Sequence, residues 1–394
     1  MRRRALLATA GSLLSAGCSA LSGGGDQGVQ RRRRRSLYGG VGVTEHIGPG
    51  GNDSMDVGVD GNFSTDLDLA DQGIDLNDTD MDQNLQVELS GRDEQQVLTA
   101  TADNESAKHI QTARDHLQTA LTNYTRQAGR GAAVTDVTPT TSFSAAIVTN
   151  NTASANDALK QAADGATDRQ KVVVLALRQV SLFLELGATA DEQLHRSWKA
   201  FSFAVGRFYS ENTAQFEPAR LRMQRHHKRA RKAQRALANN TDESCTAALE
   251  GLSEDEYNGK CDQLQSAVFD FGGFGPGMES LSGGLASLQD AVPAYENEEY
   301  ALAARRSLAA SAQFGVAMVS FDVDRDGTAV SRKARELYGV TRTLKQLCDD
   351  LQRSASAQTN DNRLLFREAR RAARQHAQSN DIVRQMPTPG ELAR

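Results

Sequence analysis

RDEQQVLTATADNESAKHIQTARDHLQTALTNYTRQAG, residues 92–129, is the stretch that decides the fold class. Its apolar residues recur at intervals of three or four, at Val97, Ala107, Ile110, Ala113, Leu117, Ala120 and Leu121. Such spacing places them on one face of an amphipathic helix. Gly129 and Gly131 follow and end the pattern. We therefore predict a helix over residues 92–129.

The same periodicity continues toward the C-terminal end of the chain, without the alternation that is typical of strands. We expect Gly187 to end one helix, Pro218 to lie in the first turn of another, and Gly272 to Gly277 to form a wide break. The prediction is an all-α fold, an irregular helical bundle or helix-hairpin stack. Its further helices are expected at 156–187, 190–211, 215–240, 243–270, 277–293, 297–320, 328–357 and 361–384.

One part of this helical region, around residues 285–315, has a distinctive pattern of aromatic and small residues. Residues 294–303 read AYENEEYALA, and Ser307, Leu308 and Ala310 follow. The pattern resembles the turn and second helix of a tetratricopeptide repeat. The Trp-Leu-Gly signature of the first helix and a 34-residue period are missing, so the resemblance implies similar packing only locally within the bundle.

The region before the helices differs in composition. No lysine or arginine occurs from Ser36 to Gly91, while aspartates accumulate at Asp53, Asp56, Asp60, Asp66, Asp68, Asp71, Asp75, Asp78, Asp80 and Asp82. Such a segment has too little apolar surface to offset the entropy lost on ordering. We predict a disordered acidic tether at 18–91. The helical domain is then expected at 92–386, with a loop at 132–155 and a disordered tail at 387–394.

The chain begins with three arginines and a short apolar run that ends at a cysteine. Arg3 and Arg4 precede Ala5-Leu-Leu, and Leu14-Ser-Ala-Gly-Cys18 closes the run. These residues resemble the twin-arginine signal and the lipobox of exported surface lipoproteins of the halophilic-archaeal type, although Ser15 stands where that family prefers leucine. The resemblance implies a signal peptide at 1–17, a lipid on Cys18 and a position at the extracytoplasmic face of the cell membrane.

Two further features suit an exported, membrane-attached protein. A run of five arginines, Arg31 to Arg35, follows the expected lipid site, and a polybasic patch strengthens the membrane binding of a single lipid chain. Asn-x-Ser/Thr sequences are acceptors for N-linked glycans. The chain has seven of them, at Asn52, Asn62, Asn77, Asn104, Asn123, Asn150 and Asn239.

Export also permits disulfide bonds. Besides Cys18, the chain has Cys245, Cys261 and Cys348, and the first two of these flank an acidic turn. We favour a bridge between Cys245 and Cys261 that joins two helical segments. The alternatives are a pairing of Cys348 with either of them, or three buried thiols.

One aspartate-rich segment has the residue types of a calcium site. Asp322, Asp324, Asp326 and the glycine after them match the first half of a calcium-binding loop, but Lys333 occupies the position of the closing glutamate. The alternative is a polar turn whose aspartates cap the next helix.

Histidines and catalytic motifs point to little chemistry. Glu192 and His195 have the Glu-x-x-His spacing of a metal-binding helix, but no second copy occurs. We expect solvated histidines here and at His226 and His227. Since no hydrolase, metalloprotease, phosphate-loop or dinucleotide motif is present, we expect a non-enzymatic protein without a cofactor.

The most distinctive feature downstream is a basic helix at residues 218–237. It carries Arg220, Arg222, Arg225, Lys228, Arg229, Arg231, Lys232 and Arg235 without one acidic residue, and a second set follows at Arg363, Arg367, Arg370, Arg371 and Arg374. The export signal argues against nucleic acid as the partner. Anionic lipid, an acidic protein partner or the chain's own aspartate-rich tether are the candidates, and the alternative is a solvated charged face.

These observations predict a lipid-anchored extracytoplasmic protein whose helical domain binds a protein partner or serves as a scaffold. Two alternatives remain. One is a solute- or ligand-binding lipoprotein that serves a transporter, and the other is an exported enzyme without a recognisable motif.

Overall fold

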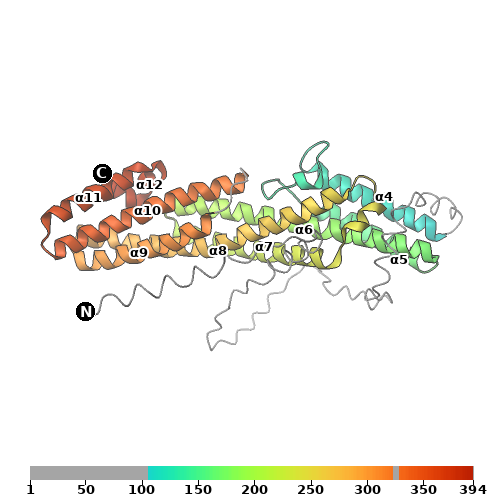
Figure 1. The fold of residues 1–394 in the computed structure, drawn as a ribbon, viewed down its shortest axis with the longest axis horizontal. Helices are drawn as coiled ribbons and strands as arrows, with labels where there is room; N and C mark the ends of the chain where they lie inside the picture. Colours follow the sequence, from blue (N-terminus) through green and yellow to red (C-terminus); the bar gives the residue numbers. More distant parts are fainter. Residues whose placement is uncertain (1–104, 323–327, 394) are drawn as a thin grey trace, which may run out of the picture. The chain divides into compact units, whose positions relative to one another are not determined.

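The computed structural model describes residues 105–322 and 328–393, and the regular elements within these two ranges are all helices (Figure 1). The predicted all-α irregular bundle is therefore confirmed for this part of the chain. The long helices are α4 (Glu105–Arg126), α5 (Ala146–Ala163), α6 (Asp168–Tyr209), α7 (Thr213–Asn240), α8 (Glu254–Glu296), α9 (Tyr300–Phe321), α10 (Ala329–Thr359) and α11 (Arg363–Ser379). The short ones are η2 (Val134–Asp136), η3 (Glu243–Ala248), α12 (Asp381–Gln385) and α13 (Pro387–Ala393).

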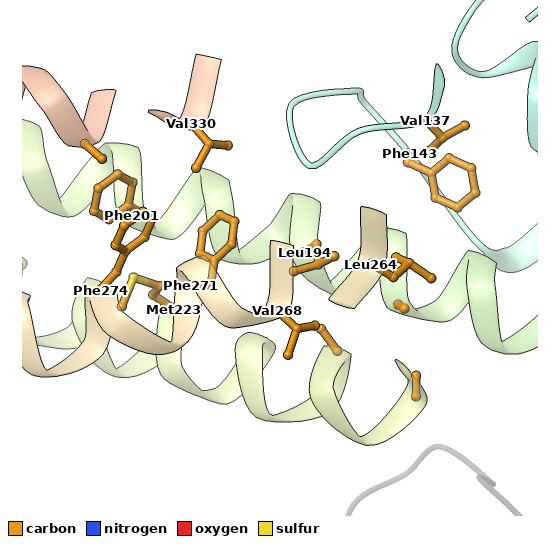
Figure 2. Close-up of a cluster of buried hydrophobic side chains, with 14 of the residues drawn as sticks. Val137, Phe143, Leu194, Phe201, Met223, Leu264, Val268, Phe271, Phe274 and Val330 are labelled. Atoms are coloured by element: carbon orange, nitrogen blue, oxygen red, sulfur yellow. The ribbon is translucent and has the colours of Figure 1, made fainter. Parts of the chain in front are cut away.

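Helices that are consecutive in the sequence pack against each other, as α4 does with α5, α6 with α7, α8 with α9, and α10 with both α9 and α11. The two longest helices, α6 and α8, have 42 and 43 residues and also contact each other. Figure 2 shows the core between them. Phe201 of α6 stacks on Phe274 of α8 with 4.7 Å between ring centroids, and the side chain of Met223 from α7 lies beside them. Burial of each such side chain contributes about 1.5–3 kcal/mol.

Three of the connections between paired helices use the same tight turn. Glu211, Glu298 and Asp361 have left-handed φ values of 53°, 64° and 53° and follow α6, α8 and α10. The residue after each one donates its backbone N–H to a carbonyl five residues earlier, at 2.9, 2.8 and 2.8 Å. These bonds satisfy carbonyl groups that a helix end leaves unpaired. The stretch 294–303 forms the second of these turns and the start of α9.

Two predicted helix breaks are wrong. Gly187 lies inside α6, and Gly272 to Gly277 lie inside α8. Glycine in a helix interior costs about 1 kcal/mol relative to alanine. Here the missing side chain permits close packing. Gly277 faces α9, where an added Cβ would lie 2.6 Å from the Cβ of Ser320. The glycines therefore set the spacing between helices rather than the ends of helices.

Three other boundaries also differ from the sequence-based expectation. The predicted loop at 132–155 becomes helical at Ala146, and the residues before it are held to the core by buried side chains such as Val137 and Phe143. The helix predicted from residue 243 begins at Glu254, after η3 and a turn that contains Gly251 at φ +80°. Pro218 lies inside α7 rather than in its first turn.

The predicted disordered tail is also wrong for residues 387–393, which form α13. Asn380 caps α12 by accepting the backbone N–H groups of Ile382 and Val383 at 3.0 and 3.3 Å. The carboxylate of Glu211, in the α6–α7 turn, accepts the backbone N–H of Thr388 at 2.8 Å and its hydroxyl at 2.6 Å. A carboxylate at a helix N-terminus is favourable for both its hydrogen bonds and its charge.

Candidate functional site: the basic surface of helix α7

Helix α7 carries the predicted basic segment, and its apolar residues place it between α6 and α8. Asn212 caps the helix by accepting the backbone N–H of Gln215 at 3.2 Å. The buried face is narrow and consists of Phe216, Ala219, Met223, Ala230, Ala233 and Leu237 together with Arg220. Since this face covers less than half of the circumference, most of the helix surface is left to solvent.

The solvent side of α7 is almost entirely cationic. No acidic residue occurs from Pro218 to Asn240. We define the α7 basic surface as the exposed cations of this helix, which are Arg222, Arg225, Lys228, Arg229, Arg231, Lys232 and Arg235. Leu221 is the large apolar side chain exposed among them, at 46%.

Arg220 does not belong to this surface, although the sequence grouped it with the partner-binding residues. Its side chain is only 11% exposed and forms ion pairs with Glu217 and, at 3.5 Å, with Glu279 of α8. The hydrogen bond with Glu217 raises the pKa of Arg220 above its ordinary value. Arg220 therefore stabilises the contact between α7 and α8 and is not available to a partner.

Six of the remaining cations lack such an ion pair. Within residues 105–322 and 328–393, no carboxylate lies within ion-pair distance of Arg222, Arg225, Lys228, Arg229, Arg231 or Arg235. By contrast, many surface cations on other helices are paired, as Arg196 is with Glu192 at 2.8 Å and Lys345 with Asp349 at 2.7 Å. These six cations thus form a concentration of positive charge that no carboxylate of residues 105–322 and 328–393 pairs with.

Two histidines mark the edges of this surface, and their environment differs from the solvated one that was expected. His226 donates from Nδ1 to Gln193 Oε1 of α6 at 2.9 Å, and His227 donates from Nε2 to the backbone carbonyl of Val268 in α8 at 2.8 Å. Burial, helped by neighbouring arginines that include Arg229, lowers the pKa of His226 to about 4. Burial also lowers the pKa of His227. Both side chains are therefore neutral at pH 7.

The structure also contains a buried polar cluster that sequence reasoning missed. Lys260 of α8 forms an ion pair of 2.6 Å with Asp191 of α6, and the two side chains are 0% and 1% exposed. The hydroxyl of Tyr124, from α4, donates to the same carboxylate at 2.5 Å. Lys260 Nζ also donates to the carbonyl of Val137 and to Gln263 Oε1, both at 2.8 Å. All three of its donors are therefore used.

This cluster, which we call the Lys260 cluster, joins α4, α6, α8 and the 132–145 segment. Burial raises the pKa of Asp191, and the ion pair and hydrogen bonds to its carboxylate oppose that shift. Gly187 makes room for it, because an added Cβ would lie 3.1 Å from the hydroxyl oxygen of Tyr124. With its charged groups closed to solvent, the cluster has no access for a substrate and serves the fold. No local spacing in the sequence signals it.

The other predicted site residues have mixed outcomes. Cys245 and Cys261 are not joined by a disulfide in the structure. The predicted bridge is therefore not formed in the structure. Burial raises the pKa of the Cys245 thiol, with smaller contributions from Asp242 and Cys261. His195 is buried, donates from Nδ1 to the carbonyl of Pro139 at 3.1 Å, and is not solvated as expected. Burial lowers its pKa.

Of the candidate calcium residues, only Asp322 is described, at the C-terminal end of α9, while Asp324 and Asp326 lie outside the described residues. The next helix, α10, is capped by Thr328, whose hydroxyl accepts the backbone N–H of Ser331 at 3.1 Å, and not by an aspartate. Lys333, in the position of the closing glutamate, pairs with Glu336 at 2.7 Å.

Among the glycosylation candidates, Asn150 and Asn239 are exposed on helices, and Asn239 lies at the end of α7. Asn123 is half-buried, and its amide donates to the carbonyl of Thr119 at 2.9 Å. Several predicted residues lie outside the described ranges. They are Arg3, Arg4, Cys18, Arg31, Arg32, Arg33, Arg34, Arg35, Asn52, Asn62, Asn77 and Asn104.

Other features of the described chain add little chemistry. Its His, Cys, Asp and Glu side chains form no group of three or more that could hold a metal ion. A shallow depression of about 350 Å³ lies beside α8 and α9, where Asp290 and Arg306 pair with each other at 3.5 Å. By length and composition α6 could cross a membrane, but 61% of its apolar window is buried, as in the core helix of any bundle.

Comparisons with known proteins leave the geometry as the basis for interpretation. No protein family, no curated protein and no solved structure matches this chain.

Proposed function

We propose that this protein is a lipid-anchored lipoprotein at the extracytoplasmic face of the membrane. Its helical domain binds an acidic protein partner through the α7 basic surface. The observation that carries the partner part of the proposal is a set of six exposed cations on α7 that pair with no carboxylate among the described residues. They are Arg222, Arg225, Lys228, Arg229, Arg231 and Arg235. Concentrated charge of one sign attracts an oppositely charged partner and speeds its association.

The anchoring part of the proposal rests on the sequence before the helical domain. The arginine pair, the apolar run and Cys18 together favour export and lipid attachment, and Arg31 to Arg35 would add affinity for anionic headgroups. A non-enzymatic role suits the remaining features. The Lys260 cluster is closed to solvent, and Asp290 and Arg306 in the depression beside α8 and α9 pair with each other.

The partner is tested by a cross-linking pull-down from intact cells. The triple variant Arg225→Gln, Arg229→Gln and Lys232→Gln should lose at least one protein that the unmodified chain retains. The matched control is Arg363→Gln, Arg367→Gln and Arg370→Gln, which removes the same charge from α11. A pull-down profile that is unchanged in the α7 variant, or changed equally in both, would contradict the proposal.

The anchor is tested separately by Cys18→Ala. This variant should appear in the medium, because Arg31 to Arg35 alone bind membranes reversibly and with strong salt dependence. Cell fractionation followed by immunoblotting measures the distribution. Retention of Cys18→Ala in the membrane fraction at high salt would rule out lipid attachment at this residue as the anchor.

A further inference from the structure

We infer that the partner segment is an extended acidic polypeptide that wraps around the exposed half of α7 and contacts both of its flanks. A flat charged surface, such as a membrane or the face of a folded domain, would meet one side only. This inference rests on the proposed function, because it specifies the kind of partner that the α7 basic surface accepts. It is carried by the distribution of the cations around the helix.

The flanks are fixed by the neighbours of α7. His226 donates a hydrogen bond to Gln193 of α6. The α7 cations that help to lower the pKa of His226 are Arg222, Arg225 and Arg229. His227 bonds to α8, and Arg231 is the α7 cation that acts on it. At about 100° per residue, Arg222 and Arg229 therefore lie on the flank beside α6, and Arg231 and Arg235 lie on the flank beside α8.

The centre of the exposed arc lies between these flanks. The helical rotation places Arg225, Lys228 and Lys232 there, opposite the buried face. The cations thus cover an arc of about 180°, whereas a helix presents a strip of roughly 100° to a flat neighbour. A planar partner would leave the guanidinium groups of at least one flank in solvent. A flexible chain can follow the curvature and reach both.

The chemistry of the surface also favours an unfolded acidic segment. Leu221 is the only large apolar side chain exposed on α7. Stable interfaces between folded proteins have an apolar centre, and this surface offers almost none. Arginine donates in a planar fork that suits carboxylates. From Arg222 to Arg235 the helix rises about 20 Å, which an extended chain spans in about six residues.

The experiment uses the full-length chain and a fluorescently labelled ten-residue polyaspartate peptide as the probe. Three double variants are compared by fluorescence anisotropy at low ionic strength. The first removes the α6 flank (Arg222→Gln and Arg229→Gln), and the second removes the α8 flank (Arg231→Gln and Arg235→Gln). The third, Arg363→Gln and Arg367→Gln on α11, is the matched control. Circular dichroism confirms that each variant is folded.

We expect each flank variant to weaken peptide binding by about 5-fold, because each removes two exposed charge pairs, and the control to change it by less than about 2-fold. If only one flank variant binds the peptide more weakly, the contact is planar. This result would overturn the inference and leave the proposed function intact. Tighter binding to vesicles of phosphatidylcholine and phosphatidylglycerol, lost with one flank alone, would overturn it in favour of a membrane.

A last variant distinguishes failure of the proposed function from failure of this inference. Arg225→Gln with Lys228→Gln removes charge from the centre of the arc, which both a planar and a wrapping partner contact. If this change and both flank changes leave binding of the peptide unaffected, the proposed function and the inference fail together. If the central change weakens binding while neither flank does, the inference alone is overturned.

Discussion

Lys260 and the cations of α7 have the same kind of charge but opposite situations. Lys260 is 0% exposed, and all its donors are bonded to α6, α8 and the 132–145 segment. Arg222, Arg225 and Arg229 of α7 face solvent and have no internal ion pair in the described ranges. The difference teaches that burial and partners, not residue type, decide whether a cation serves the fold or is available to bind another molecule.

The physical reason is the cost of removing a charge from water. A buried charge must be compensated by a partner and by hydrogen bonds, so loss of either partner leaves an uncompensated ion inside the protein. An exposed charge keeps its water and contributes little to stability. The first kind is therefore sensitive to substitution in its effect on folding, and the second in its effect on binding.

The largest expected effect is at Lys260. Lys260→Met should lower the free energy of unfolding by about 3–5 kcal/mol, because Asp191 would remain buried without its ion-pair partner. Urea denaturation followed by circular dichroism measures this. The double variant Lys260→Met with Asp191→Leu should recover much of the loss, since neither charge is then left alone. A decrease of less than about 1 kcal/mol in the free energy of unfolding of Lys260→Met would contradict the distinction between Lys260 and the exposed cations of α7.

A second effect tests whether the space around the Lys260 cluster is as tight as the geometry indicates. Gly187→Ala should destabilise the protein by about 1–3 kcal/mol, because the new methyl group would press against the Tyr124 hydroxyl at 3.1 Å. Gly206→Ala is the matched control on the same helix. It meets no atom within 4 Å and should stabilise by about 0.5 kcal/mol through helix propensity. Equal effects at the two glycines in thermal denaturation would contradict this view of the cluster.

A third effect concerns pH at the edge of the α7 basic surface. The pKa of His226 is lowered from 6.5 to about 4, so the unfolded chain binds this proton more readily than the folded one. Its contribution to stability is complete above pH 6.5 and is lost as the pH falls toward 4. After solvent screening this loss amounts to about 1–2 kcal/mol.

The variant His226→Gln should reduce the slope of that part of the stability profile, measured by urea denaturation at a series of pH values. An unchanged slope between pH 4 and 6.5 in His226→Gln would show that burial of this histidine does not contribute to the pH dependence of stability.

The smallest expected effect is on stability at the α7 basic surface itself. Replacing Arg225 and Arg229 together by glutamine should change the free energy of unfolding by less than about 0.5 kcal/mol, because exposed cations without partners stabilise the fold little. Removal of like charges from one helix could even stabilise it slightly. A loss above about 1 kcal/mol in urea denaturation would mean that these residues serve the fold, as Lys260 does.

Much of the architecture could be predicted from the sequence, because helix periodicity is a local property. The apolar spacing at Ile110, Ala113 and Leu117 predicted α4, and these residues are buried. The predicted helix breaks at Gly187 and at Gly272 to Gly277 were wrong because the role of these glycines is not a local property. From its neighbours in the sequence, a glycine predicts a helix end. Here each glycine instead allows close contact with a helix that is distant in the sequence.

The candidate site divides in the same way. The run of cations at residues 222–235 was visible in the sequence, since charge content needs no structure to be counted. The sequence did not show that Arg220 pairs with Glu217 and Glu279. Nor did it show that His226 and His227 bond to α6 and α8. These contacts depend on which face of α7 packs against each neighbouring helix.

The sequence by itself determined that residues 105–322 and 328–393 are helical and that α7 is densely basic. An exported, lipid-anchored protein stays a prediction from the residues up to Cys18. Only the tertiary structure decided which charges are buried. Tyr124 and Asp191 are separated by 67 positions, and Lys260 and Val137 by 123. Contacts over such separations follow from the packing of whole helices, and the cost of desolvating a charge depends on those contacts alone.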